Sequence, residues 1–268
     1  MFCFTLLVLS SQLSAATEPP RRIISLAPNI TEILFALDLG DRIVGVTGVC
    51  DFPEAARRKP KVGGMSDPSL EAVVSLKPDL VVMTTDGNTP EFEARLRSLH
   101  IRTYVFRARK LSELPKGIDD LGLALGVKGK AHILSREIES SLKSSHLRAH
   151  PRPKKKVLFI IWPEPLIVAG PGTAIDDAIT LLGHDNIASR STASYPKYSL
   201  EEVINNPPDI IFIGKGHSDM KARSKDLLKK LAIVPAVSNG KVFFLSDSLY
   251  RLGPRVVQGI AEIAACLE

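Results

Sequence analysis

The chain has 268 residues, of which 44% are apolar and 24% are charged, and its formal net charge is +6. This composition is typical of a water-soluble globular protein with enough length for two modest cores. The basic runs Arg57-Arg58-Lys59 and Arg148 to Lys156 hold much of the positive charge, but no aromatic residues are interleaved with them. They therefore favour a solvated surface and argue against a nucleic-acid partner.

Residues 1–16 are expected to form a secretory signal peptide. Phe2 to Ser10 is an uncharged apolar run, and Ser14-Ala15-Ala16 supplies small residues that suit cleavage near Ala16. The run is shorter than the roughly 20 apolar residues that a membrane-spanning helix needs. No basic residue precedes it, so a buried N-terminal strand or helix is the alternative. Export predicts a periplasmic protein. A disulfide between Cys50 and Cys266 would be permitted there, but their expected positions, in a loop of the first lobe and in a C-terminal helix, favour two free thiols.

Residues 17–110 are expected to form an N-terminal α/β lobe. A short helix should follow Ser69, because the Ser side chain can cap its first turn, and Pro78 should end it. The run after this helix is short, apolar and rich in β-branched residues, which favours a strand buried on both faces. The predicted strands are Arg22 to Leu26, Ile43 to Val46 and Leu80 to Met83, with a further helix at Thr31 to Leu37.

Residues 111–150 are expected to connect two lobes through helices. From Leu111 to about His146 the chain carries almost no strand signal, and its apolar residues recur at intervals of three and four. One or two long helices therefore join the lobes, and Pro151-Arg152-Pro153 marks the end of the connection.

Residues 151–268 repeat the alternation of strands and helices. The predictions are strands at Lys156 to Ile161 and Ile210 to Ile213, a rigid loop at Trp162 to Pro165, and a helix at Ala174 to Leu182 that ends at Gly183. The segment Ser69 to Met83 also returns, half a chain length later, as Ser199 to Ile213. The fold class predicted is α/β, with two Rossmann-like lobes, mainly parallel sheets, a long rigid helix between them and a cleft.

The loops that follow strands are candidate ligand-binding segments, because ligands bind beyond the carboxyl ends of strands in open parallel sheets. They are Ala27 to Asn29, Thr47 to Phe52, Thr84 to Asn88, Trp162 to Pro165 and Gly214 to His217. The loops Gly63 to Asp67 and Tyr195 to Tyr198 join them, because each precedes one copy of the repeated segment. Loops from both halves imply one ligand held between the lobes.

Catalytic signatures are missing from the sequence. It contains no Gly-x-Ser-x-Gly elbow and no Gly-Lys-Ser/Thr phosphate loop. Gly170-Pro171-Gly172 lacks the third glycine of a dinucleotide turn. The six histidines lie too far apart to suggest converging metal ligands. We therefore predict a binding protein without catalytic residues, metal site or cofactor.

Several of these segments resemble a known family. The opening Arg22 to Glu32, the strand Val44-Gly45-Val46 with Asp51-Phe52-Pro53 after it, and both Ser-Leu-Glu copies are similar to the periplasmic binding proteins of ABC importers for cobalamin, haem and iron-siderophores. The similarity covers essentially the whole chain after the signal peptide and is greatest to the cobalamin-binding members. It implies the class III periplasmic binding protein fold, with cobalamin or a related corrinoid held in the cleft.

The resemblance also implies a membrane partner, the permease dimer of an ABC importer in the inner membrane, and a monomeric binding protein. Family members use one exposed glutamate on each lobe to contact arginines of the paired permease subunits, and the matching residues are Glu71 and Glu201. Two carboxylates at a fixed separation can meet two guanidinium groups of a two-fold symmetric partner. The alternative is that both stabilise helix dipoles. A capping box cannot explain both copies, because only Glu202, and not Ala72, stands three residues after the Ser.

The expected ligand-binding residues come mainly from the same resemblance. Cobalamin binders line the cleft with aromatic side chains that stack on the corrin, but only one of those positions keeps a ring here. The matching positions are Val49, Met65, Thr84, Ile167, Tyr195 and Ser248. The polar matches Asp247 and Arg251 could hold corrin amides or pair with each other. Asp86 and Gly87 of a post-strand loop, and the sole tryptophan Trp162, which could equally be a core residue, complete the set.

Other ligands stay open on the same scaffold. Haem would require an axial ligand, which Tyr195, Tyr198, Tyr250 or His217 could supply. A ferric siderophore would prefer a cluster of arginines, whereas the proposed loops carry only Arg251. An enzyme acting on a metal chelate would need a nucleophile or metal site, and the sequence offers neither.

Overall fold

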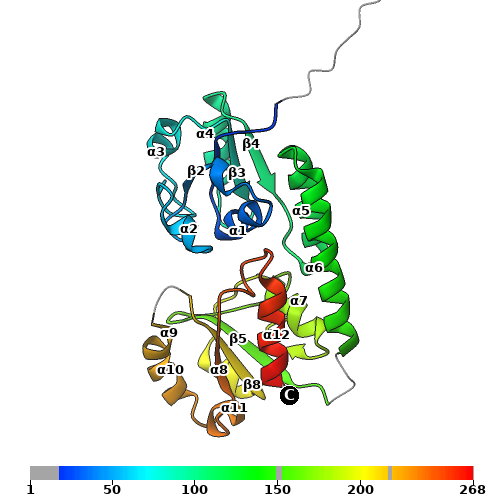
Figure 1. Ribbon diagram of the computed structural model, residues 1–268. Helices are drawn as coiled ribbons and strands as arrows, with labels where there is room; N and C mark the ends of the chain where they lie inside the picture. The colour runs from blue at the N-terminus through cyan, green and yellow to red at the C-terminus, as the bar shows by residue number, and fades with distance from the viewer. Residues whose placement is uncertain (1–17, 149–152, 217–218, 268) are drawn as a thin grey trace, which may run out of the picture.

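The computed structural model describes residues 18–148, 153–216 and 219–267, which form two α/β lobes joined by a pair of helices (Figure 1). This architecture confirms the predicted fold class. Within the described ranges, no helix is both long enough and apolar enough to cross a membrane. The predicted signal peptide, residues 1–16, lies outside the described residues.

The N-terminal lobe is built on a four-stranded parallel sheet with the order β2-β1-β3-β4. Strands covered on both faces must be apolar throughout, and the central strand β3 (Leu80–Thr84) is buried at every residue. The remaining elements are β1 (Ile23–Ser25), α1 (Pro28–Ala36), the 3-10 helix η1 (Gly40–Arg42), β2 (Ile43–Val46), α2 (Glu54–Arg57), α3 (Leu70–Ser75), α4 (Pro90–Ser98) and β4 (Thr103–Phe106).

The C-terminal lobe repeats this arrangement with one antiparallel strand. Its sheet has the order β6-β5-β8-β9, with β7 paired to the start of β5, and only β6 runs antiparallel to its neighbour. The elements are β5 (Lys156–Pro163), β6 (Leu166–Val168), α7 (Ala174–Leu181), β7 (Asp185–Asn186), α8 (Leu200–Asn205), β8 (Ile210–Gly214), α9 (Met220–Arg223), α10 (Lys225–Lys230), α11 (Pro235–Ser238), β9 (Val242–Leu245) and α12 (Val256–Leu267).

Strand β5 is longer than predicted. It continues through Trp162 and Pro163, which pair with β6, so the predicted rigid loop is wrong for its first half. A proline is tolerated at this end of the strand because it lacks only the N–H group. Strand β8 pairs with β5 no further than Ile160, so no second neighbour requires that N–H group.

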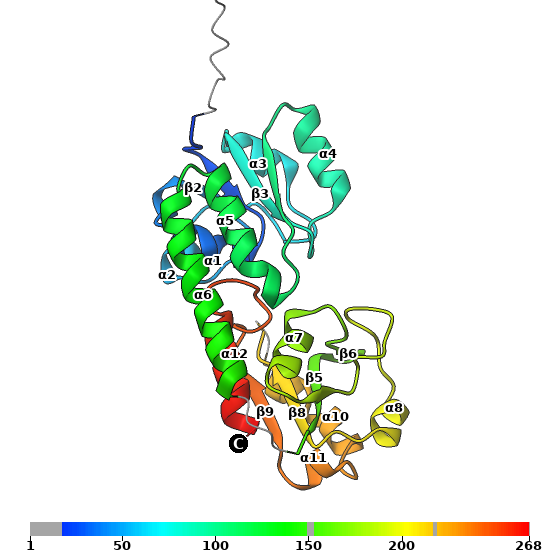
Figure 2. The same cartoon turned by 90° about the vertical axis from the view of Figure 1, so that its right-hand side faces the viewer.

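Two helices connect the lobes, as the apolar periodicity predicts. After the 3-10 helix η2 (Leu111–Glu113), α5 (Leu114–Ala124) packs against α6 (Lys128–Arg148). Helix α6 extends alongside both lobes and contacts α12 of the C-terminal lobe (Figures 1 and 2). The connection is therefore a rigid pair of helices with tertiary contacts to both ends of the molecule.

The two copies of the repeated segment form the same capped helix. The Ser69 hydroxyl accepts a hydrogen bond from the backbone N–H of Ala72 at 3.2 Å, and the Ser199 hydroxyl accepts one from Glu202 at 3.1 Å. In the second copy, the Glu202 carboxylate also accepts from the backbone N–H of Ser199 at 2.6 Å. Of the two copies, only the second has the capping box, as predicted.

The aspartate shared by the copies ties two strands together. Asp79 accepts hydrogen bonds from the backbone N–H of Arg22, just before β1, at 3.0 and 3.1 Å. Asp209 accepts one from the backbone N–H of Lys156, at the start of β5, at 2.7 Å. Asp79, just before β3, therefore fixes the start of the neighbouring strand β1. Asp209, just before β8, fixes the start of the neighbouring strand β5 in the same way.

The lobes share a core and touch directly. The largest cluster of buried apolar side chains includes both sheets together with α6 and α12. The Asn29 side-chain amide donates to the backbone carbonyl of Leu252 at 3.4 Å, and the backbone N–H of Leu111 donates to Asp177 of α7 at 2.9 Å. These contacts restrict rotation of one lobe against the other.

Both cysteines of the described part, Cys50 and Cys266, are free, as predicted. Cys50 is buried, and its Sγ atom lies 3.1 Å from the hydroxyl oxygens of Thr31 and Thr47. Its packing in the N-terminal core explains why it cannot reach Cys266 on the C-terminal helix.

Candidate functional site

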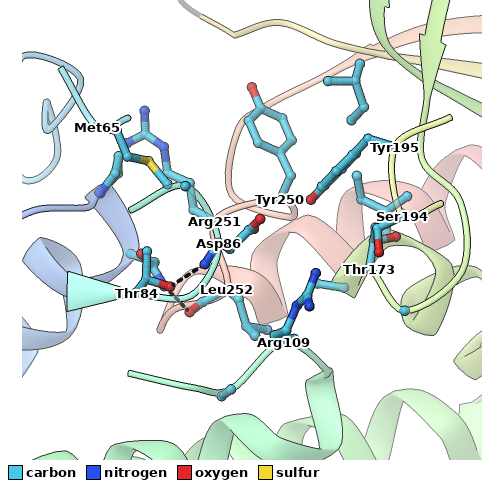
Figure 3. Close-up of a pocket in the computed structure, with 18 of the residues that line it drawn as sticks. Met65, Thr84, Asp86, Arg109, Thr173, Ser194, Tyr195, Tyr250, Arg251 and Leu252 are labelled. Atoms are coloured by element: carbon cyan, nitrogen blue, oxygen red, sulfur yellow. Dashed lines mark hydrogen bonds between the residues drawn. The ribbon is translucent and has the colours of Figure 1, made fainter. Parts of the chain in front are cut away.

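A cavity of about 540 Å³ lies between the lobes, within the range of about 300–1,000 Å³ that is common for small-molecule sites. Loops at the carboxyl ends of strands in both sheets line it, and the close-up shows how their side chains converge (Figure 3). Its lining from the N-terminal half includes Pro28, Asn29, Val49, Met65, Thr84, Asp86, Gly87, Ala108 and Arg109. The C-terminal half contributes Ile161, Ile167, Thr173, Ile175, Ser194, Tyr195, Tyr250, Arg251 and Leu252, among others.

Eight of the predicted ligand-binding residues meet at this cavity. They are Val49, Met65, Thr84, Asp86, Gly87, Ile167, Tyr195 and Arg251. The loop Thr84 to Asn88 is fixed by its own hydrogen bonds, because the Asn88 side chain accepts from the backbone N–H of Thr84 and donates to the carbonyls of Leu26 and Met65. Asn88 therefore holds the two N-terminal loops that carry Met65 and Asp86 against each other.

Trp162 does not line the cavity, because successive residues of a strand face opposite sides of the sheet. Its neighbour Ile161 faces the cavity instead. The Trp162 indole packs against a separate cluster of buried apolar side chains in the C-terminal lobe, which includes Ile160 and Ile211. It donates a hydrogen bond to the backbone carbonyl of Glu164 at 2.8 Å, and the centre of its ring lies 5.1 Å from the guanidinium of Arg223. Trp162 is thus a structural residue of the far face.

Asp247 and Ser248 also lie outside the cavity lining. Asp247 pairs with Arg251 at 2.6 Å and with Arg255 at 3.1 Å, so the alternative in which Asp247 and Arg251 bind each other is the one found. Ser248 is buried, and its hydroxyl forms a hydrogen bond with that of Ser246.

Arg251 and Arg255 belong to an ion-pair network that joins the lobes. Arg255 binds both carboxylate oxygens of Glu32, at 2.6 and 2.9 Å, and Arg251 lies 2.6 Å from Asp51. Glu32 and Asp51 come from the N-terminal lobe, whereas both arginines come from the segment around the start of α12. The Glu32 side chain is only 1% exposed and that of Arg251 only 6%. Three carboxylates, with that of Asp247, therefore neutralise the positive charge at this end of the cavity.

Arg109 supplies the cationic group that stays available to a ligand. It forms no ion pair with any residue in the described ranges, and Figure 3 shows its guanidinium pointing into the same space as the Tyr195 hydroxyl. Asp86, on the loop after the neighbouring strand β3, also lines the cavity and adds a carboxylate. The cavity thus combines mainly apolar walls with a few polar groups of both charges, an arrangement that fixes the orientation of a largely apolar ligand.

The tyrosines at the site are neutral phenols. Desolvation raises the pKa of Tyr195 to about 12, and the Asp86 carboxylate adds to this effect. Burial also raises the pKa of Tyr250, whose hydroxyl accepts a hydrogen bond from the backbone N–H of Gly216 at 2.8 Å. Tyr198 does not line the cavity. Its hydroxyl donates a hydrogen bond to the backbone carbonyl of Ile187 instead. His217 lies outside the described residues.

Arg109 and Thr173 were not among the predicted site residues. Arg109 follows β4, and the run Thr103-Tyr104-Val105-Phe106 has the β-branched and aromatic composition of a strand. Recognising that strand would have added its carboxyl-end loop to the candidates. Thr173 caps α7 through a hydrogen bond from the backbone N–H of Asp176 at 3.1 Å, and this cap places the start of α7 at the cavity.

The predicted docking residues Glu71 and Glu201 lie on α3 and α8, in the first turn of each helix. Both are exposed, and neither belongs to the cavity. The described ranges contain no cluster of three or more His, Cys, Asp or Glu side chains that could hold a metal ion.

The sequence profile of the periplasmic binding protein family matches residues 23–249, most of the chain. The chain belongs to this family. Its members bind substrates for transporters and are not enzymes, which confirms the predicted class of function. Family membership also implies a small-molecule ligand and a permease partner.

The relatives of this chain are named for different ligands. A vitamin B12-binding protein of Vibrio parahaemolyticus is 27% identical over 99% of this chain and 96% of its own. The crystal structure of a periplasmic vitamin B12-binding protein of Vibrio cholerae matches with a TM-score of 0.82 and 27% identity, over 93% of this chain and 97% of that one. A periplasmic heme-binding protein from Roseiflexus sp. RS-1 matches with a TM-score of 0.84 and 28% identity, over 92% and 97%.

Proposed function

We propose that this protein binds cobalamin or a related corrinoid in the cavity between its lobes and delivers it to the permease of an ABC importer. The observation that carries the proposal is the cavity itself, which both lobes line with mainly apolar side chains and a few polar groups. The names of the vitamin B12-binding relatives, which match nearly the whole chain, support the choice of ligand.

The lining suits the chemistry of a corrinoid. A corrin ring has large apolar faces, which Val49, Met65 and Ile167 can contact, and Tyr195 can stack on it. Its peripheral amides need donors and acceptors, which Asp86 and Arg109 provide, and Arg109 also suits the phosphate of the nucleotide loop. A corrinoid is larger than the enclosed volume, so part of the ligand extends into the open cleft.

Haem is the second candidate, because a heme-binding relative is equally similar and because Tyr195 and Tyr250 line the cavity. An axial tyrosine binds ferric iron as the phenolate. In the ligand-free cavity, desolvation raises the pKa of Tyr195 to about 12 and also raises that of Tyr250, so an axial phenolate would form only when bound iron displaces the phenolic proton. Ferric siderophores fit less well, since three carboxylates neutralise the Arg251 and Arg255 pair and leave only Arg109.

Delivery requires export and docking. We propose that residues 1–16 are removed on export to the periplasm, that the mature protein is a monomer, and that Glu71 and Glu201 contact basic groups on the two permease subunits. Their exposure on matching helices of the two lobes supports this role. The lobe boundaries proposed are residues 17–110, 111–150 and 151–268, with the helical connection in the middle.

A ligand titration tests the proposal. The mature chain, purified without ligand, is titrated with cyanocobalamin and separately with hemin, and the visible spectrum is recorded. We expect saturable, submicromolar cyanocobalamin binding and no Soret band from specific hemin binding. A Soret shift with hemin and no response to cyanocobalamin would show that the ligand is haem and not a corrinoid. The visible spectrum is the suitable readout, because Trp162 lies outside the cavity lining and its fluorescence would not report directly on a ligand there.

A further inference from the structure

Val74 and Ile204 occupy the same position in the two copies of the repeated segment, and both are exposed, by 41% and 39%. The other shared positions have local explanations, since the serines cap the helices, Val73 and Val203 enter the core, and the aspartates tie strands. Helix propensity does not explain a β-branched apolar residue here, because such a residue loses rotamer freedom in a helix, and packing explains it only in part, because both side chains stay substantially exposed.

Each of these residues lies beside a docking glutamate. Val74 follows Glu71 by three positions, and Ile204 follows Glu201 by three, and side chains three apart share one face of a helix, about 5–6 Å between Cβ atoms. Neither glutamate forms an ion pair with a described residue, whereas Glu93 on α4 is paired with Arg97 at 2.6 Å. Each lobe thus presents a carboxylate–apolar patch, defined as Glu71 with Val74 on α3 and Glu201 with Ile204 on α8.

We propose that Val74 and Ile204 are contact residues of the docking surface, each entering an apolar depression of one permease subunit beside the basic group that receives the glutamate. This inference rests on the proposed docking function of Glu71 and Glu201. The apolar contact would exclude water from the neighbouring ion pair, which strengthens the electrostatic attraction between the two charges. One patch on each lobe corresponds to one subunit of a two-fold symmetric partner.

The charges of the patches favour this partner over a second copy of the chain. A symmetric contact between copies would bring carboxylates of one patch against carboxylates of another, and like charges repel across an interface. Helix α3 lies at the edge of its lobe away from α6 in Figure 1, and helix α8 lies at the edge of its lobe away from α6 in Figure 2. Val74 and Ile204 are both exposed, so both patches are accessible to a partner.

The test compares two pairs of substitutions in the mature chain. The Val74→Ser, Ile204→Ser variant removes the apolar half of both patches and leaves the glutamates unchanged. The control, Leu123→Ser with Ile133→Ser, alters apolar residues that are 67% and 62% exposed on α5 and α6. Affinity is measured by surface plasmon resonance against the importer of the same organism in lipid nanodiscs. We expect the first variant to bind about tenfold more weakly or worse, and the control to bind like the unaltered chain.

Further measurements separate this inference from the docking proposal. Both variants should keep the melting temperature and the affinity for cyanocobalamin. If Glu71→Ala with Glu201→Ala loses importer binding while Val74→Ser with Ile204→Ser keeps it, the apolar contact is refuted and the glutamate docking stands. If both variants keep it, both proposals fail. A dimer in sedimentation experiments that the Val74→Ser, Ile204→Ser variant abolishes would assign the patches to a second copy and would also overturn the inference.

Discussion

At the cavity, single side chains from opposite lobes face one another. Arg109 follows β4 of the N-terminal lobe, and Tyr195 lies on the loop before α8 of the C-terminal lobe, yet both point into the same space. A ligand that contacts both therefore bridges the lobes. The Tyr195 ring offers an apolar face, and its hydroxyl stays protonated because desolvation raises its pKa to about 12.

Substitution of Tyr195 distinguishes stacking of its ring from a contact of its hydroxyl. Tyr195→Ala should weaken cyanocobalamin binding on the order of tenfold, because an aromatic contact is lost, whereas Tyr195→Phe should bind nearly as well as the unaltered chain. Both affinities can be measured by isothermal titration calorimetry at pH 7. If Tyr195→Phe were as impaired as Tyr195→Ala, the hydroxyl and not the ring would be the important group, as expected for a hydrogen bond from Tyr195 to the ligand, and the stacking role would be contradicted.

Individual side chains were harder to predict than the loops that carry them. The loops of Met65 and Tyr195, which line the cavity, were selected because each precedes a copy of the repeated segment, and the loop of Asp86 was selected by the rule that ligands bind at the carboxyl ends of parallel strands. This rule could not decide between Ile161 and Trp162, because that choice depends on which face of β5 turns inward. The apolar run proper, Val157 to Ile161, shows no alternation from which the inward face can be inferred.

At the scale of elements, the repeated segment is the unit that both lobes share. Helices α3 and α8 have only six residues each, and isolated helices of this length are unstable in water. Their serine caps and their single buried valines, Val73 and Val203, therefore hold them in place. The position of the docking glutamates depends on these local contacts.

Removing either cap should destabilise the lobe that contains it. Ser69→Ala and Ser199→Ala should each lower the free energy of unfolding by about 1 kcal/mol, and the Ser199 change should be the smaller, because the Glu202 carboxylate can still accept from the backbone N–H of residue 199. Urea denaturation monitored by circular dichroism measures both. Ser75→Ala, at the other end of α3, is the matched control. Equal stability of Ser69→Ala and this control would contradict the capping role.

The helices and strands were largely predictable, since turn residues and apolar runs delimit them. The hairpin of β5 and β6 was not, because Pro163 favours a loop in sequence and is tolerated only at a strand end that lacks a second neighbour. Strand β4 was also missed. Three of its four residues are only partly buried, so its sequence lacks the continuous apolar character of β3.

At the scale of the whole molecule, the lobes are joined by more than the connecting helices. A network of five charged side chains links α1 and the loop after β2 to the start of α12, and both lobes contribute to one core. Sequence reasoning placed a ligand between two lobes but did not predict this network, because Glu32 and Arg255 lie at opposite ends of the chain. Only the fold brings them together.

Loss of one partner from this network should be costly. Arg255→Ala would leave the Glu32 carboxylate, 1% exposed, without its two closest hydrogen bonds, and breaking a buried ion pair in this way costs about 3–5 kcal/mol. Chemical denaturation measures the loss of stability. The control Lys143→Ala removes an exposed pair with Glu139 on α6 and should change stability little. Similar stabilities for the two variants would show that the network contributes nothing to lobe association.

ATP-dependent uptake of labelled cyanocobalamin by proteoliposomes that contain the importer of the same organism tests the central claim most directly. With the unaltered protein outside the vesicles, uptake should rise well above that of vesicles alone. With Glu71→Ala and Glu201→Ala together, uptake should fall to that background although cyanocobalamin binding is unchanged. Uptake that does not depend on the protein, or that survives the double substitution, would contradict the account.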